Sequence, residues 1–395
     1  MNVRRAVGIA LVGPLLGAGL MSPALAVEAG LDSPPVLDLG FEDTTDDSSE
    51  NANDVTLRGH NGSEPTGYAY VDGVAEGSRA LSLTGNTYLD LGSSTDLQPE
   101  NLTLSFWINP TAALTGEQVI TWNKGAYNTD GWYLSSESDT SPLAVSVGPA
   151  TGQPYKVRVA SANRAEFFPA GEWTHVAMTY DSVSKDVAFY RNGERVPSTV
   201  ANSIGGDATG VLGSSEALPK TIGFNGPLYN GAYLNAALDE YKVYNGVATL
   251  GDVVGLYEES GRQIDRLAIA QSDADALSLP ATATLGLVLA TTGSRGSDIS
   301  WTSSDPEVID ALGVVTRPEE GSPDAEVTLT AHVWYLDGEV VEREFVVLVP
   351  ADGGSDLLGE SGLNAVQLSD TYLTNAAAKE HEYLCLLYTS PSPRD

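Results

Sequence analysis

The sequence is poor in cysteine, histidine and basic residues, and each shortage argues against a class of protein. With one cysteine in 395 residues, the chain cannot form an internal disulfide, so packing alone must stabilise its fold. Its four histidines lie in unrelated segments and show neither metal-ligand spacing nor a recognisable catalytic triad. Only 20 lysines and arginines stand against 53 aspartates and glutamates, a net charge of −33. Such an acidic surface repels phosphate backbones, so we expect no nucleic-acid partner.

Long apolar runs are missing beyond the N-terminus, so we expect no membrane insertion. The N-terminus carries Arg4-Arg5, an apolar stretch from Val7 to Leu20, and then Ala24-Leu25-Ala26. This order is typical of a secretory signal peptide, here residues 1–26. The alternative, a transmembrane anchor, is disfavoured because Gly13-Pro14 interrupts the run. We therefore expect a secreted, monomeric protein whose acidity favours solubility outside the cell.

Glycine and proline are abundant, with 41 and 21 residues, which favours turn-rich β structure over long helices. Within Gly171–Tyr180, apolar and polar side chains alternate with a period of two, and this predicts a strand. Val187–Val196 repeats the alternation after a short polar loop, so the two segments are predicted to form a hairpin. Inside it, Asn192-Gly193 supplies a second turn, because both residues tolerate positive φ.

Other segments with the same alternation extend the β pattern along the first 250 residues. The clearest is Leu102–Ile108, in which every second side chain is leucine, phenylalanine or isoleucine. Two more, 80–83 and 88–91, flank Gly85-Asn86 and are predicted to pair as a hairpin. The remaining predicted strands are 36–41, 118–122, 131–134, 156–159, 221–224 and 237–244.

The central hairpin, the strand Leu102–Ile108 and the closing strand Ala237–Tyr244 resemble those of laminin-G-like, concanavalin A-type jelly-roll domains. The resemblance covers residues 36–258 and implies an all-β sandwich. In such sandwiches the first and last strands usually pair, which would bring Glu42 near Asp239. Related jelly rolls often hold a structural Ca²⁺ there, so we expect Glu42 and Asp239 as ligands, with Asp43 a weaker candidate. The alternative is that these carboxylates are simply solvated.

A polar loop flanked by aromatic residues suggests a sugar site in this domain. A sugar ring stacks its C–H groups on an aromatic plane, while amides and carboxylates bind its hydroxyls. The residues predicted to bind a polysaccharide or other glycan in this way are Trp122, Asn123, Tyr127, Asn128, Asp130 and Trp132. Core packing is the alternative for Trp122 and Trp132.

Catalysis finds no support in the same region. Glucanases that share the fold carry a Glu-x-Asp-x-x-Glu strand, which places an acid and a nucleophile across one bond. Here Asp239-Glu240 is followed by Tyr241-Lys242, so the motif is absent. We expect no catalytic site in this chain.

Residues 264–349 are predicted to form a second, smaller all-β unit. Ile299–Pro306 supplies a core strand and turn, and further strands are expected at 327–333 and 344–349. The pattern resembles a bacterial immunoglobulin-like domain of the kind found as a spacer in surface polysaccharide enzymes, which implies a small β-sandwich. Trp301 is then a core residue of this unit.

The C-terminal part changes character and has a helical composition near Thr374–Leu384. Residues 350–384 read as a linker followed by a segment that resembles the start of the β-L-arabinofuranosidase-like glycoside hydrolases. Cys385–Asp395 resembles a translated sequencing adapter, and we expect it to be an artefact on a truncated reading frame. The chain is thus predicted to be the lectin-like accessory region of a polysaccharide-degrading glycoside hydrolase. The alternative is a surface or adhesion protein whose jelly roll binds protein or spaces domains.

Overall fold

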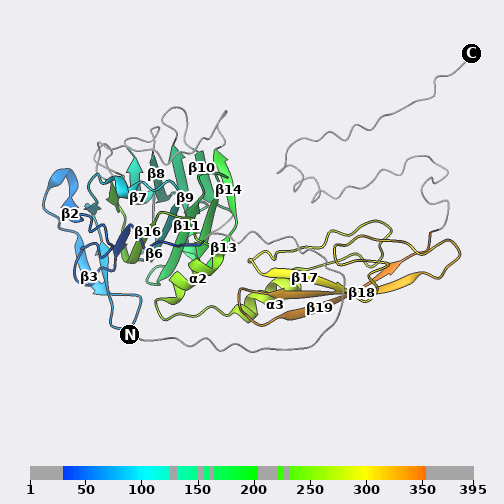
Figure 1. The fold of residues 1–395 in the computed structure, drawn as a ribbon. Coiled ribbons are helices and arrows are strands. Elements are labelled where there is room, and N and C mark those ends of the chain that lie inside the picture. Colours follow the sequence, from blue (N-terminus) through cyan, green and yellow to red (C-terminus); the bar gives the residue numbers. More distant parts are fainter. Residues whose placement is uncertain are drawn as a thin grey trace, which may run out of the picture. The chain divides into compact units, whose positions relative to one another are not determined.

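The computed structural model describes residues 30–124, 131–148, 155–160, 163–202, 220–225 and 232–352. The chain divides into two compact units, one of Met1–Ile269 with Ser294–Gly296 and one of Ala270–Gly293 with Ser297–Asp395. Both are built mainly of antiparallel strands (Figure 1), as the alternating sequence pattern predicts. The described helices are α1 (Arg164–Phe167), α2 (Leu250–Glu258) and α3 (Arg266–Ala276), with 3₁₀ turns at η1 (His60–Gly62) and η2 (Thr95–Leu97).

The first unit contains two eight-stranded antiparallel sheets that share one hydrophobic core. The first sheet runs in the order β13 (Glu194–Val196), β12 (Val187–Arg191), β11 (Thr174–Tyr180), β6 (Leu102–Pro110), β16 (Ala236–Tyr244), β4 (Arg79–Leu83) and β3 (Tyr68–Asp72), and β1 (Leu37–Leu39) also pairs with β16. The second runs β14 (Ser198–Asn202), β10 (Tyr155–Val159), β9 (Ala144–Gly148), β8 (Gly131–Ser136), β7 (Gln118–Lys124), β15 (Thr221–Ile222), β5 (Thr87–Asp90) and β2 (Thr56–Gly59).

The central hairpin forms as predicted, since β11 pairs with β12 from Val176 opposite Arg191 to Tyr180 opposite Val187. The turn into β13 also follows the sequence. Asn192 and Gly193 adopt φ angles of 52° and 80°, the left-handed conformation that a two-residue hairpin turn requires.

The first and last strands of the unit pair, which confirms the expectation drawn from the jelly-roll resemblance. Leu37 lies opposite Val243 and Leu39 opposite Tyr241, so β1 is fixed on the strand that ends the sandwich. Phe41, Asp43 and Glu240 have left-handed φ angles of 56°, 57° and 46°. The backbone therefore turns sharply on both sides of Glu42 and directly after Asp239.

The predicted hairpin of 80–83 and 88–91 is wrong. Strand β4 pairs with β3 and β16 in the first sheet, whereas β5 pairs with β2 and β15 in the second. Gly85, with a φ of 70°, therefore lies where the chain crosses from one sheet to the other. A left-handed glycine can serve a hairpin turn or, as here, a connection between sheets, so the sequence pattern does not separate them.

None of the three described helices was predicted from the strand pattern, and α2 matters most for the sandwich. Helix α2 begins with a capping box, in which Thr249 Oγ1 accepts from Asp252 N and Asp252 Oδ2 accepts from Thr249 N. Its Val253 packs with Ala177 and Tyr190, so α2 covers the outer face of the first sheet. For this reason β6 is buried on both faces along almost its whole length.

The second unit is a three-stranded sheet in the order β17 (Asp298–Ser303), β18 (Ala325–Trp334) and β19 (Val341–Val349). All three strands lie where the sequence predicts them. Trp301 is 7% exposed, packs on Phe345 and donates from Nε1 to Ala290 O over 2.8 Å, so it is a core residue as expected.

Candidate functional site

The structure places the predicted sugar-binding tryptophans in the interior. Trp122 and Trp132 are 1% and 2% exposed, and neither ring offers a free face for stacking. The expectation of an exposed platform at these two residues is therefore corrected. The physical reason is that both lie in paired strands, β7 and β8, whose side chains are covered on either face of the sheet.

The two rings nevertheless lie on opposite faces of the second sheet. Trp132 pairs in register with Asn123 and joins the main core between the sheets. Trp122 pairs in register with Tyr133, stacks on it at 5.0 Å between ring centroids, and belongs to a separate cluster. Asn123 is also buried and donates from Nδ2 to Leu97 O over 2.7 Å, which withdraws it from a ligand.

The other predicted sugar-binding residues, Tyr127, Asn128 and Asp130, lie outside the described residues. The sugar site predicted from the sequence is therefore not assembled by the part of it that the structure describes.

A hollow of about 540 Å³, lined by both apolar and polar residues, opens at the other end of the same strands. Ala113 and Leu114 come from the connection between β6 and β7, and Asp139 and Thr140 from the connection between β8 and β9. The third side is α1 with its N-cap residue, which contributes Asn163, Arg164 and Ala165. A volume of this size falls in the range of small-molecule sites.

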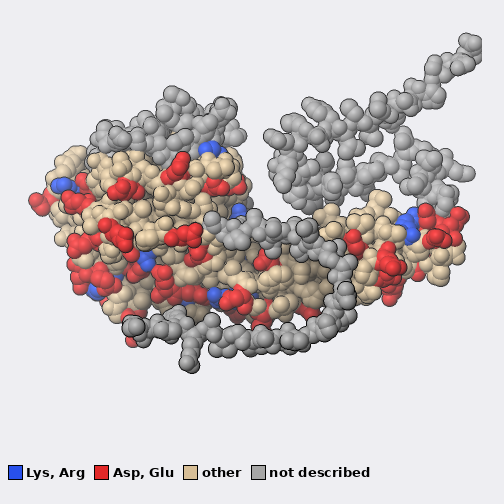
Figure 2. All heavy atoms as spheres, viewed as in Figure 1, with Lys and Arg blue, Asp and Glu red and all other residues tan. Residues whose placement is uncertain are grey.

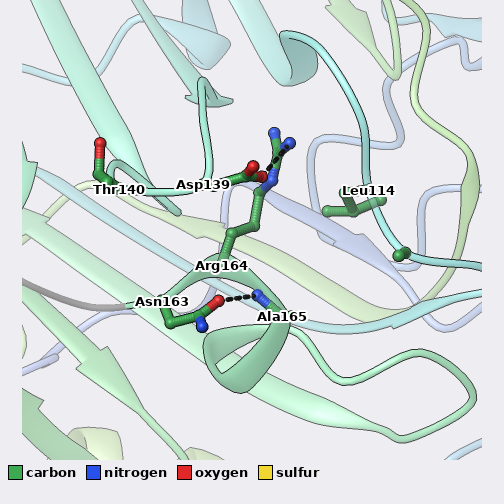
Figure 3. A pocket seen from close by; sticks show the side chains of 7 residues that line it. Leu114, Asp139, Thr140, Asn163, Arg164 and Ala165 are labelled. Atoms are coloured by element: carbon green, nitrogen blue, oxygen red, sulfur yellow. Dashed lines mark hydrogen bonds and ion pairs between the residues drawn. The ribbon is translucent and has the colours of Figure 1, made fainter.

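Arg164 organises this pocket (Figure 3). Its side chain is 5% exposed, its Nη2 donates to Asp139 Oδ1 over 2.8 Å, and its Nη1 donates to Gly116 O over 2.7 Å. Asn163 Oδ1 accepts from Ala165 N, which caps the short helix. The guanidinium thus holds three chain segments together, and the Asp139 carboxylate neutralises its charge.

The pocket combines apolar carbons with hydrogen-bonding groups of both kinds. Leu114 lies across from the Arg164–Asp139 pair in Figure 3 and supplies an apolar wall. Asp139 offers acceptor oxygens, Thr140 a hydroxyl, and Asn163 an amide NH₂. Sequence reasoning missed this site because its residues are scattered over three connections without aromatic neighbours.

The two carboxylates predicted to bind calcium lie near enough for the charge of Glu42 to act on Asp239, while Glu42 Oε1 and Oε2 both accept from Arg79 N over 3.2 Å. Asp239 is fully buried; its Oδ2 accepts from Val74 N over 2.8 Å and its Oδ1 from Glu240 N over 2.9 Å. Burial raises the pKa of Asp239 to about 7, and the nearby charges of Glu240 and Glu42 act in the same direction. Asp239 has no ion-pair partner among the described residues. Carboxylate oxygens are the donor type that a hard cation such as Ca²⁺ prefers.

The described chain alone does not supply a complete carboxylate cage. It contains no group of three or more histidine, cysteine, aspartate or glutamate side chains arranged to hold a metal. Asp43 is engaged elsewhere, because its Oδ1 accepts from Arg79 Nε over 3.1 Å. A Ca²⁺ at Glu42 and Asp239 would therefore take its other oxygens from backbone carbonyls and water, which calcium accepts readily.

One serine–histidine pair resembles catalytic chemistry but cannot reach a substrate. Ser105 Oγ and His175 Nε2 lie 2.9 Å apart, and both residues are buried between the first sheet and α2. Burial, and then the charge of Lys242, lowers the pKa of His175 to about 3, so the imidazole stays neutral. The cavity beside the pair holds about 10 Å³, space for one water at most. The pair is structural.

Comparison with known families agrees with this architecture. Residues 83–254 match the concanavalin A-like lectin/glucanases superfamily, and residues 262–352 match the atrophied bacterial Ig domain. The chain therefore carries a concanavalin A-like domain followed by an atrophied bacterial Ig domain. No curated protein matches the sequence significantly. Within the described residues, none of the helices has the length and apolar character needed to cross a bilayer.

Solved structures with a similar fold include domain 4 of AbnA, a GH43 extracellular arabinanase from Geobacillus stearothermophilus, in complex with arabinotriose. It is 20% identical, with 57% of this chain and 98% of that chain covered and a TM-score of 0.41. The binding domain of Paraclostridial Mosquitocidal Protein 1 is 20% identical over 57% of this chain and 52% of that chain, with a TM-score of 0.43. A structure of botulinum neurotoxin type C, whose cell entry depends on two ganglioside molecules, is 14% identical. The match covers 78% of this chain and 72% of that chain, with a TM-score of 0.43.

Proposed function

We propose that the first unit is a carbohydrate-binding module and that the pocket at Arg164 holds one or two sugar residues of a glycan. The observation that carries the proposal is the lining of the pocket, in which Asp139, Asn163 and Arg164 face an apolar wall. A sugar ring has the matching chemistry, because its C–H faces are apolar and its rim carries hydroxyls that donate and accept. The match to the concanavalin A-like lectin superfamily supports the same class of ligand.

Binding through this pocket is expected to be weak. A sugar offers little apolar area, and a few hydrogen bonds must replace those that it makes to water, so we expect a Kd on the order of 0.1–1 mM. Because Arg164 is already neutralised by Asp139, the pocket favours an uncharged sugar. Weak binding suits an accessory module, since tethering raises the local concentration of an attached enzyme on a polymer.

The setting that we propose is a secreted, monomeric polysaccharide-degrading protein. Support comes from the sequence: the signal-peptide pattern of residues 1–26, and the resemblance of 366–384 to the start of β-L-arabinofuranosidase-like glycoside hydrolases. Both segments lie outside the described residues. In this proposal the Ig-like unit is a spacer, and Ca²⁺ at Glu42 and Asp239 stabilises the sandwich.

The pocket is tested by filling it. Thr140 is exposed at its rim, so Thr140→Trp should block a sugar without disturbing the core. Val183→Trp adds a tryptophan at an 88% exposed residue outside the lining and is the matched control. Affinity electrophoresis in gels that contain arabinan, arabinogalactan or β-glucan should show retention of the parent and of Val183→Trp, and weaker retention of Thr140→Trp. Equal retention of all three proteins would refute the pocket as the site.

A further inference from the structure

An aromatic pair lies at an edge of the first sheet, on the opposite side from the pocket. Strand β3 forms the edge of the sheet and pairs only with β4 along the described chain. It carries Tyr68 and Tyr70, whose register partners Leu83 and Leu81 are core residues. The two tyrosines therefore lie on the core-facing side of the sheet, at its edge strand.

The pair is half anchored and half exposed. Tyr70 packs against the main hydrophobic core, whereas Tyr68 is 42% exposed. The two rings make an edge contact, with centroids 6.5 Å apart and planes at 88°. This contact favours one orientation of Tyr68, which lowers the side-chain entropy that would be lost on binding.

Carboxylates lie near the aromatic pair. Arg79, which donates to Tyr70 O, also binds Asp43 and Asp72, and burial together with the charges of Asp43 and Asp46 raises the pKa of the Tyr70 hydroxyl. Asp46 and Asp72 are exposed. Over the face of this unit visible in Figure 2, acidic side chains clearly outnumber basic ones.

Arg79, the cation at this edge, is fully engaged in holding the strand. Its Nη2 donates to Tyr70 O over 2.8 Å, its Nη1 to Asp72 Oδ1 over 3.0 Å, and its Nε to Asp43 Oδ1 over 3.1 Å. The groups left to meet a ligand are an aromatic ring, a phenol and carboxylate oxygens. A ligand with apolar C–H faces and several hydroxyl donors, but no negative charge, fits this set.

We propose that the Tyr68–Tyr70 edge is a second sugar-binding surface, which takes an uncharged stretch of the same polysaccharide that enters the pocket. The inference rests on the proposed carbohydrate-binding function, but it uses residues that the pocket does not. The sugar stacks on Tyr68, and its hydroxyls donate to Asp46 and Asp72. A polyuronate is rejected because its carboxylates would meet like charges.

The spacing of the two surfaces suits a polymer. Arg191 of β12 donates from Nε to Phe167 O of α1 over 2.9 Å, so the pocket lies at the β12 side of the first sheet. From β12 to β3 the order passes through β11, β6, β16 and β4, which is five strand spacings or roughly 24 Å. One glycan chain that contacts both surfaces would bind more tightly than a short oligosaccharide that reaches one.

The test compares variants of the whole protein by affinity electrophoresis on arabinan, arabinogalactan and β-glucan, with polygalacturonate as the charged polymer. Tyr68→Ala should weaken retention by about tenfold on a neutral polymer, the size expected for one stacked ring. Tyr68→Phe keeps the ring and should stay within about twofold of the parent. Val183→Ala, which truncates an 88% exposed residue between β11 and β12, is the matched control. Asp46→Ala should also weaken retention and does not alter β3 itself.

The outcomes separate this surface from the pocket. If Tyr68→Ala and Asp46→Ala are retained like the parent while Thr140→Trp is weakened, the aromatic edge is not a site and the pocket stands. If Tyr68→Ala is weakened while Thr140→Trp is not, the pocket assignment falls and the edge stands. Equal retention of the parent on polygalacturonate, or no retention on any neutral polymer, would also overturn the proposal.

Discussion

Tyr241 of β16 and Thr121 of β7 join the two sheets of the sandwich through a hydrogen bond of 2.5 Å between their hydroxyls. Both residues are buried, and burial raises the pKa of Tyr241 well above its usual range. The bond crosses the core where apolar side chains otherwise meet.

The first prediction concerns this bond. Tyr241→Phe leaves the Thr121 hydroxyl buried without its partner, which should lower the free energy of unfolding by roughly 1–3 kcal/mol. Adding Thr121→Val replaces both polar groups by apolar ones of similar shape, and the double variant should recover most of the loss. Denaturant unfolding of the two single variants and the double variant measures the coupling. Additive losses would show that the two hydroxyls act independently.

The second prediction concerns calcium. If Glu42 and Asp239 hold Ca²⁺ in the folded state alone, removing it with EDTA should lower the Tm by roughly 5–10 °C, the effect of a ligand present at about 100 times its Kd. Asp239→Ala should abolish the difference between calcium and EDTA. Asp54→Ala removes an exposed carboxylate elsewhere, and this variant should keep the difference in Tm between calcium and EDTA. A parent Tm that is the same in calcium and EDTA would leave these carboxylates without a cation.

The third prediction is a pH dependence of stability. His175 has a pKa of about 3 when folded and an ordinary value of 6.5, so between these limits the unfolded chain binds one more proton. Stability from this residue is therefore complete above pH 6.5 and falls by up to about 1.4 kcal/mol per pH unit as the pH drops toward 3. His175→Phe keeps a ring against Trp107 and Tyr257, which contact the imidazole at centroid distances of 5.1 and 5.8 Å.

The measurement for His175 is how steeply the unfolding free energy changes with pH. The absolute free energy is not compared, because the phenylalanine variant also leaves Ser105 unpaired. Unfolding free energies at pH 4.5, 5.5 and 6.5 should fall less steeply for His175→Phe than for the parent. Parallel slopes would show that the imidazole does not remain neutral in the fold.

The fourth prediction tests the interior position of Trp132. Since its side chain is in the main core, Trp132→Ala should cost roughly 3–5 kcal/mol of unfolding free energy. Val183→Ala, at an exposed loop, should stay within about 0.5 kcal/mol of the parent. A Trp132→Ala variant with parental stability would show that the ring is not buried in the core, and Trp132 would again be a candidate platform for a sugar.

The strands could be predicted because alternation reports which side chains share a face. It does not report what covers the second face. In Leu102–Pro110, the residues Ser105 and Trp107 alternate with apolar ones as outward-facing residues should, yet α2 packs over them and buries both. The same gap explains the wrong prediction at Trp122, since an aromatic residue on an outer face looks identical in sequence whether it is covered or exposed.

Long-range pairing was predictable only where a family pattern supplied it. The contact of β1 with β16 followed from the jelly-roll resemblance, whereas the turn at Gly85 looked like a local hairpin and is a crossing between sheets. The pocket at Arg164 brings together Gly116, Asp139 and Asn163, which no spacing rule connects. Such a site depends on how connections fold back over the sandwich, and that information is not local.

Strand β16 lies in the middle of the first sheet but is the last strand of the unit to leave the ribosome. Strands β1, β4 and β6 all pair with β16, so they lack this common partner until residues 236–244 are synthesised. Strand β1 precedes β16 by about 200 residues in the chain. We therefore expect the unit to fold after its synthesis rather than during it, at a rate limited by contacts of long sequence separation. A shortened chain that ends before residue 236 would expose two bare strand edges, and we expect it to aggregate rather than to yield a smaller module.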